Sequence, residues 1–243
     1  FTMLKTELKL SFRGMDMMIF AVCMPVVIVI LLGIIYGGKP AFDGADYTFL
    51  EQSFGAVSTI AVCAGGVMGL PLVISDYRQK KILKRFKITP SSPLLLLSIQ
   101  VAIYMIYSLI ALVLIYLVSA LLFGMSLKGA FLPFIGAFFL VMISMFSIGM
   151  LVGGVSPNIK IASVLASLLY FPMLIFSGAT LPYEVMPAAL QKVADVLPLT
   201  QGIKLLKATS LGLPAENGMA SLIVMAVIAV VCGGLSIRFF QWE

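Results

Sequence analysis

The sequence predicts an all-α integral membrane protein with six transmembrane helices, and three observations support this prediction. Of its 243 residues, 61% are hydrophobic and only 11% are charged, whereas soluble domains carry about 25% charged residues. The mean hydropathy is +1.14. The apolar residues form six segments, each long enough to cross a hydrocarbon core of about 30 Å, which takes about 20 helical residues.

No charged residue lies in the interior of any of these segments. Their bounds are Met17–Tyr36, Phe54–Ser75, Ser98–Phe123, Phe131–Val155, Ile161–Ala179 and Met219–Phe239. Six spans place both termini on the same side of the membrane. With the termini inside, the cytoplasmic segments contain eleven of the sixteen Lys and Arg residues. The positive-inside rule therefore predicts a multi-pass protein of the cell (plasma) membrane with both termini in the cytoplasm.

The first 14 residues are expected to form an amphipathic helix that lies in the cytoplasmic interface of the membrane. Its apolar face would comprise Phe1, Leu4, Leu8 and Phe12. Its basic face would comprise Lys5, Lys9 and Arg13. A frayed basic N-terminus that only helps to set the topology is the alternative.

Residues 76–89, between the second and third spans, contain the densest run of basic side chains and are predicted to form a cytoplasmic helix. Its apolar arc would comprise Ile82, Leu83 and Phe86. Its basic arc would comprise Lys80, Lys81, Lys84, Arg85 and Lys87. The segment Thr89-Pro90-Ser91-Ser92-Pro93 would end the helix. Such a helix can lie on anionic lipid headgroups or fit a groove on a soluble motor protein, and the two roles are compatible.

Residues 181–212, between the fifth and sixth spans, are half apolar but too interrupted to cross the membrane. The interruptions are Pro182, Pro187, Pro198 and Gly202. Two short helices fit, over Pro187–Val196 and Thr200–Leu211. Apolar helices of this length predict a re-entrant hairpin on the outer side, buried against protein.

Several classes of chemistry are excluded by composition. Histidine is absent, which removes Ser-His and Cys-His nucleophiles and His-ligated metals, and no catalytic or metal site is expected. Cys23, Cys63 and Cys232 lie inside apolar segments as small hydrophobic residues. A partial phosphate-loop pattern ending at Lys39 is followed by Pro40 instead of the required Ser or Thr. The net charge of +6 resides in loops, so we expect no binding of nucleic acid.

The spans also contain features whose role the sequence leaves open. Small residues recur four apart, in Gly65/Gly69 and Gly149/Gly153, and allow close helix packing either within the chain or across a dimer. Prolines at 25, 71 and 172 form either ordinary kinks or elements of a gate. Ion-coupled carriers usually keep an ionisable residue near mid-membrane, so its absence indicates an external energy source.

Three stretches resemble the membrane subunit of the type-2 ATP-binding-cassette (ABC) export permeases. The first is the basic helix ending in Lys87-Ile88-Thr89-Pro90. The second is the apolar run from Phe171 through Ser177-Gly178 to Pro182, and the third is Val196-Leu197-Pro198-Leu199-Thr200-Gln201-Gly202. In one departure, Lys81-Ile82 stands where the family commonly has Gly-Thr.

The resemblance implies that residues 1–243 form one transmembrane permease domain. It would work as a dimer, more readily a homodimer than a heterodimer, with cytoplasmic ABC ATPase subunits that bind ATP and Mg. The chain itself would not be an enzyme. It would export drugs, antibiotics, lipids or lipid-linked glycans through a pathway between the first, second and fifth spans and their dimer mates.

The resemblance also assigns residues. The ATPase-coupling residues would be Arg78, Lys80, Lys81, Ile82, Leu83, Lys84, Arg85, Phe86 and Lys87. The substrate pathway and its exit would involve Pro25, Tyr170, Phe171, Phe176, Ser177, Gly178, Pro182 and Pro198. Three alternatives remain open: an ion-coupled carrier or channel, a non-transporting sensor or immunity subunit, and an intramembrane enzyme with Asp76 as its one candidate acid.

Overall fold

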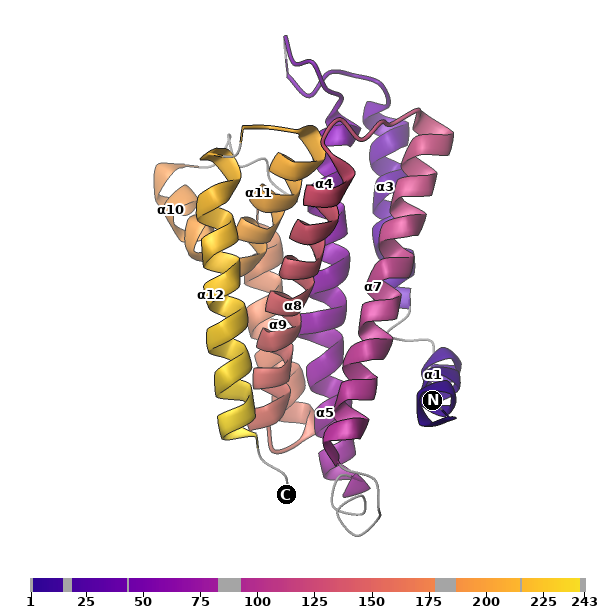
Figure 1. Cartoon of the computed structure of the whole chain (residues 1–243), viewed down its shortest axis with the longest axis vertical. Helices are drawn as coiled ribbons and strands as arrows, with labels where there is room; N and C mark the ends of the chain where they lie inside the picture. The colour runs from indigo at the N-terminus through magenta and orange to yellow at the C-terminus, as the bar shows by residue number, and fades with distance from the viewer. Residues whose placement is uncertain are drawn as a thin grey trace.

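A computed structural model describes residues 2–14, 19–42, 44–82, 93–177, 187–214 and 216–240. The described chain is an upright bundle of helices, with one short helix lying outside it (Figure 1). The N-terminal half comprises α1 (Thr2–Gly14), η1 (Ile19–Cys23), α3 (Met24–Tyr36), α4 (Phe49–Cys63), η2 (Ala64–Gly69), α5 (Leu70–Gln79) and α7 (Pro93–Phe123). The C-terminal half comprises α8 (Phe131–Val155), α9 (Ile159–Phe176), α10 (Ala188–Val196), α11 (Pro198–Leu211) and α12 (Glu216–Phe239).

Within the described residues, five helices are long and apolar enough to cross a membrane. They are the continuous helix Phe49–Gln79, formed by α4, η2 and α5, together with Leu95–Phe123, Phe131–Val155, Ile159–Phe176 and Gly218–Phe239. The first expected span is present as a shorter apolar helix, Ala21–Tyr36. The fold class predicted from hydropathy, an all-helical integral membrane protein, is therefore confirmed.

Two of the membrane helices contain a π-helical turn that ends two residues before a proline. η1 precedes Pro25, and η2 precedes Pro71. A proline lacks the N–H of a helical residue, and its ring clashes with the carbonyl four residues earlier. In both spans that carbonyl belongs to the π segment, whose wider turn accommodates the ring. Pro172, in contrast, lies inside α9 without such a segment.

The helix formed by α4, η2 and α5 is the largely buried centre of the bundle, whereas α9 and α12 are largely exposed. Close glycine contacts join this centre to α8. A Cβ on Gly149 would lie 1.9 Å from the carbonyl oxygen of Gly66, and one on Gly153 would lie 3.0 Å from the Cα of Pro71. These two glycines therefore allow α8 to pack closely on η2 and α5 within one chain. Packing within the chain and packing across a dimer were the two roles that their spacing left open.

The two short helices expected before the last span correspond to α10 and α11. α11 is mostly buried and packs against α4, α8 and α12. A Cβ on Gly55 of α4 would lie 2.8 Å from the amide nitrogen of Lys207, so the two helix backbones touch. Gly212 ends α11 with a φ of 68°, a left-handed conformation that glycine adopts without strain.

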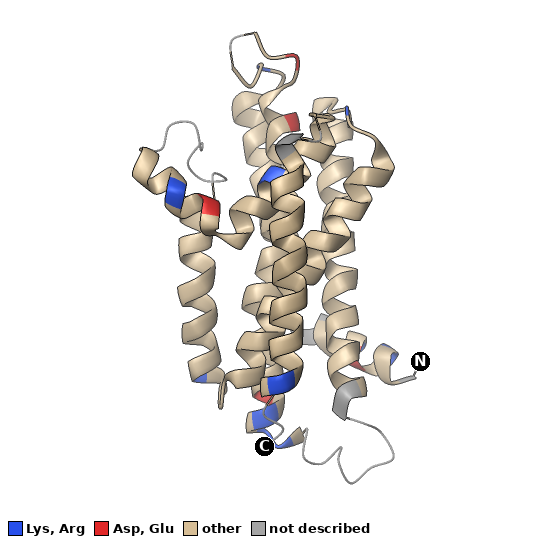
Figure 2. Ribbon diagram, turned by 60° about the vertical axis from the view of Figure 1, so that its left-hand side comes forward, with Lys and Arg blue, Asp and Glu red and all other residues tan. Residues whose placement is uncertain are grey.

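The charged side chains of the described residues lie toward the two ends of the bundle. Figure 2 shows blue and red ribbon at the ends and tan ribbon through the middle. One end carries the C-termini of α5, α8 and α12 and the start of α7 and α9 (Figure 1). We call it the basic end, because its described cations are Arg78, Lys80, Lys81, Lys160 and Arg238.

Candidate coupling site and substrate pathway

The helix expected over residues 76–89 is interrupted early in the structure. α5 ends at Gln79, and Lys81 adopts a φ of 56°, which residues other than glycine rarely take. Lys80 and Lys81 are exposed, and Ile82 is half-buried. The remaining candidate coupling residues lie outside the described residues: Leu83, Lys84, Arg85, Phe86 and Lys87.

Arg78 does not share the exposed position of its basic neighbours, because it is 6% exposed. Its Nη1 donates to the carbonyl oxygen of Gly153 at 3.0 Å and to that of Ser156, and its Nη2 donates to that of Gly154 at 3.0 Å. The last carbonyls of a helix have no partner within it. The guanidinium therefore caps the C-terminus of α8, where it also complements the negative end of the helix dipole.

The same guanidinium reaches the end of α12. Its carbon lies 5.3 Å from the centroid of the Phe240 ring, within the range of a cation–π contact. One residue further along, the side-chain oxygen of Gln79 accepts from the amide nitrogen of Ile159 at 3.3 Å. The end of α5 is thus fastened to α8, to the start of α9 and to the segment after α12.

The helix α1 is fastened to the basic end by a polar cluster. A carboxylate oxygen of Glu7 accepts from the Tyr77 hydroxyl at 2.7 Å and from the Gln100 amide at 3.0 Å, and that amide also donates to the Tyr77 hydroxyl at 2.8 Å. A second bond joins the hydroxyl of Tyr107, in α7, to that of Ser11 at 2.7 Å. Because Glu7 and Ser11 are four residues apart, they share one face of α1.

Sequence reasoning missed this cluster and the burial of Arg78. Glu7 is an acid in an otherwise basic helix, which was a signal for a specific partner. For Arg78 the signal was its spacing, because it follows the buried Pro71, Ile74 and Ser75 on one face of α5.

The candidate pathway residues lie on separate elements. Pro25 is buried in the first turn of α3, and Pro198 starts α11. Four residues belong to α9 and its C-cap: Tyr170, Phe171, Phe176 and Ser177. Gly178 and Pro182 lie outside the described residues.

The side chains on α9 differ in exposure. Phe171 is 51% exposed, whereas Ser177 is 2% exposed and donates its hydroxyl to the carbonyl of Leu174 at 3.0 Å. The rings of Tyr170 and Phe171 meet edge to face at 5.7 Å. α3 packs mainly on α4 and α7, whereas α9 packs mainly on α5 and η2. Among the described pathway residues, those of α3 and those of α9 therefore lie on helices that do not pack extensively on each other within one copy of the chain.

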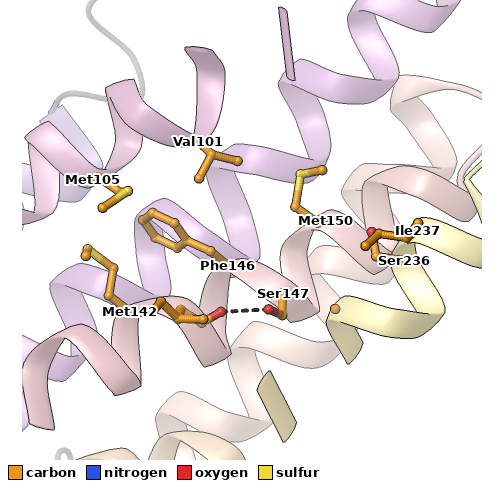
Figure 3. A pocket seen from close by; sticks show the side chains of 10 residues that line it. Val101, Met105, Met142, Phe146, Ser147, Met150, Ser236 and Ile237 are labelled. Carbon is orange, nitrogen blue, oxygen red and sulfur yellow. Dashed lines mark hydrogen bonds between the residues drawn. The ribbon is translucent and has the colours of Figure 1, made fainter. Parts of the chain in front are cut away.

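Two adjoining apolar grooves lie elsewhere, between α7, α8 and α12. Their volumes are about 250 and 290 Å³. Residues that line both are Val101, Met105, Met150, Ser236 and Ile237. Figure 3 shows the side chains of the first groove. We call the two together the α7–α12 groove, and none of the candidate pathway residues that the structure describes lines it.

Comparison with known proteins assigns the chain to a family. The model of the ABC-2 type transporter family matches residues 1–211. Among curated proteins, Nodulation protein J of Rhizobium leguminosarum bv. viciae is 35% identical over 85 residues, which is 35% of this chain and 33% of that protein. The aligned part thus spans about a third of this relative. Because the family model matches most of its length, the chain belongs to the ABC-2 type transporter family.

Proposed function

We propose that the chain is the membrane-spanning permease subunit of an ATP-driven exporter, powered by a separate cytoplasmic ATPase that binds ATP and Mg. Its substrate would be hydrophobic or amphiphilic: a drug, an antibiotic, a lipid or a lipid-linked glycan. Permeases of this family normally work with ATPase subunits. The basic end would face the cytoplasm, because its five described cations together with Lys5 and Lys9 of α1 outnumber the five described Lys residues of the opposite end.

The observation that carries the proposal is the set of side-chain contacts that link the end of α5 to the neighbouring helices. Tyr77 contacts α1 and α7, Arg78 holds the end of α8 and the ring of Phe240, and Gln79 holds the start of α9. The segment that begins at Lys80 follows directly on this junction. A displacement of that segment by an ATPase would therefore be transmitted through these contacts to α1, α7, α8 and α9.

The substrate pathway of this proposal requires two copies of the chain. α9 is largely exposed along its length, and in α3 Ile34 and Ile35 are 70% and 58% exposed. A second copy packed on these faces would place the pathway residues of both copies around one passage. ATP binding and hydrolysis would then open this passage alternately to the two sides of the membrane.

The test is co-purification of the ATPase from native membranes in mild detergent, followed by an ATPase assay. Replacing Ile82, Leu83 and Phe86 with Ser removes the apolar side chains by which the loop would bind its partner. The triple variant should insert normally but lose the ATPase. A matched control replaces three exposed apolar residues of α10, at the opposite end: Leu190, Val193 and Val196.

The control should retain the ATPase. Undiminished ATPase recovery with the first variant would show that the loop does not couple the two proteins. Recovery of the wild-type chain alone, with flux that follows an ion gradient, would replace the proposal with an ion-coupled carrier.

A further inference from the structure

The chain leaves α5 through a left-handed turn at Lys81, at the basic end of the bundle. The amide of Lys80 still donates to the carbonyl of Asp76 at 2.9 Å, as in a continuing helix. The amide of Lys81 donates instead to the carbonyl of Arg78, three residues back, at 2.9 Å. Among the described residues other than glycine, Lys81 alone has a positive φ, 56°. This conformation brings the Cβ atom close to the following carbonyl oxygen, so it is unfavourable for a lysine.

The surroundings of the turn, and not the lysine side chain, hold this conformation. The side chain of Lys81 is exposed, whereas the next residue, Ile82, is half-buried and packs against the apolar core of the bundle. Arg78 already lies level with the last carbonyls of α8. Four more residues of straight helix would carry Ile82 about 6 Å further, past the end of α8. The turn therefore keeps Ile82 against the bundle.

The turn starts from a fixed base. The hydroxyl of Tyr77 donates to Glu7, the guanidinium of Arg78 donates to three carbonyls at the end of α8, and the side chain of Gln79 accepts from the amide of Ile159. With these three residues held, the backbone angles of Lys80 and Lys81 set the direction in which the basic segment leaves the bundle. Unfavourable backbone conformations that persist in a fold often lie at functional sites.

We propose that Lys81 is a positioning residue of the coupling site. Its left-handed turn packs Ile82 against the bundle and so fixes the direction in which the basic segment meets the ATPase. The positioning role rests on the proposed function, because it requires an ATPase, whereas the turn itself does not.

Glycine and alanine at position 81 distinguish a turn from a continuous helix. In a continuous helix alanine is the most favourable residue and glycine is among the least favourable. In a left-handed turn the order is reversed, because glycine adopts a positive φ without steric cost. Both substitutions remove the charge and the long side chain of lysine, so their comparison does not depend on either.

The experiment compares Lys81→Gly with Lys81→Ala in the full chain. Thermal unfolding in one detergent reports on the turn. The ATP hydrolysis that co-purifies with each mole of chain from native membranes reports on the positioning role. Lys81→Gly should recover about fivefold more hydrolysis than Lys81→Ala, with a midpoint of unfolding about 2–4 °C higher.

The neighbouring position provides the matched control. Lys80 has a φ of −77°, which alanine adopts as readily as lysine does, so Lys80→Ala should equal or exceed Lys80→Gly in both measurements. Both variants lose the ion pair with Asp76, so this loss cancels in their comparison.

Equal hydrolysis with the two variants at position 81, or more with Lys81→Ala, would overturn the positioning role, even where Lys81→Gly has the higher midpoint. The turn would then serve folding alone. A midpoint for Lys81→Gly at or below that of Lys81→Ala would overturn the turn itself. A wild-type chain that recovers no ATPase would overturn the proposed function and the positioning role together, whereas the midpoints, measured on the chain alone, would still decide whether Lys81 forms the turn.

Discussion

Arg78 is buried, unlike the exposed Lys80 and Lys81 that follow it, because its guanidinium is enclosed by backbone carbonyls at the end of α8. Hydrogen bonds from a charged donor each contribute about 1.5–3 kcal/mol, and the planar fork of the guanidinium suits three acceptors at once. Lys80, in contrast, forms an ion pair with Asp76 at 2.7 Å in which its own side chain is 63% exposed. Pairs of this kind contribute less than about 1 kcal/mol.

Arg78→Gln is therefore expected to lower the stability of the detergent-solubilised protein by about 3 kcal/mol, seen as a lower midpoint of thermal unfolding. Lys80→Gln, two residues away, should change that midpoint little. Arg78→Lys should fall between wild type and Arg78→Gln, because it keeps the charge but loses the fork. Equal midpoints for Arg78→Gln and Lys80→Gln would show that the three carbonyl bonds contribute no net stability.

At the scale of elements, the crossing of α8 and η2 is set by backbone contact between two glycines. Gly149→Ala would place a methyl group 1.9 Å from the carbonyl oxygen of Gly66, so the helices must separate. Overpacking of this kind costs about 1–3 kcal/mol. Gly136, on the same helix, has nothing within 4 Å of its Cβ position.

Gly136→Ala should thus leave stability unchanged or raise it by up to about 1 kcal/mol. Thermal unfolding of the two alanine variants in one detergent provides the comparison. If Gly149→Ala is as stable as Gly136→Ala, the crossing tolerates an increase in helix separation and does not depend on glycine.

The helices could be predicted from the sequence better than the contacts between them. Hydropathy alone located the spans, because a membrane segment must be continuously apolar, and the prolines and Gly212 located the two short helices. The contacts of Arg78 and Glu7 could not be derived from composition, since they depend on which helices become neighbours. Gly66 and Gly149 are 83 positions apart, and only the folded chain shows that they touch.

At the scale of the whole molecule, the distribution of charge predicts the orientation in the membrane. In a variant with Cys23, Cys63 and Cys232 replaced, single cysteines at Lys39 and Lys160 mark opposite ends of the bundle. A membrane-impermeant maleimide should label the Lys39→Cys variant in intact cells. It should label the Lys160→Cys variant only after permeabilisation, because the basic end is expected inside. The reverse pattern would invert the topology and place the basic end outside.

The capping of α8 by Arg78 has a consequence for how such proteins diverge. Its hydrogen-bond partners are main-chain oxygens of Gly153, Gly154 and Ser156, which every amino acid supplies. A change of side chain at these positions therefore removes no acceptor and calls for no complementary side chain at position 78, although a Cβ on Gly153 would also press on the Cα of Pro71 at 3.0 Å. The contact would therefore produce no correlated substitutions among related sequences. An analysis of correlated positions would not detect this link between the ends of α5 and α8.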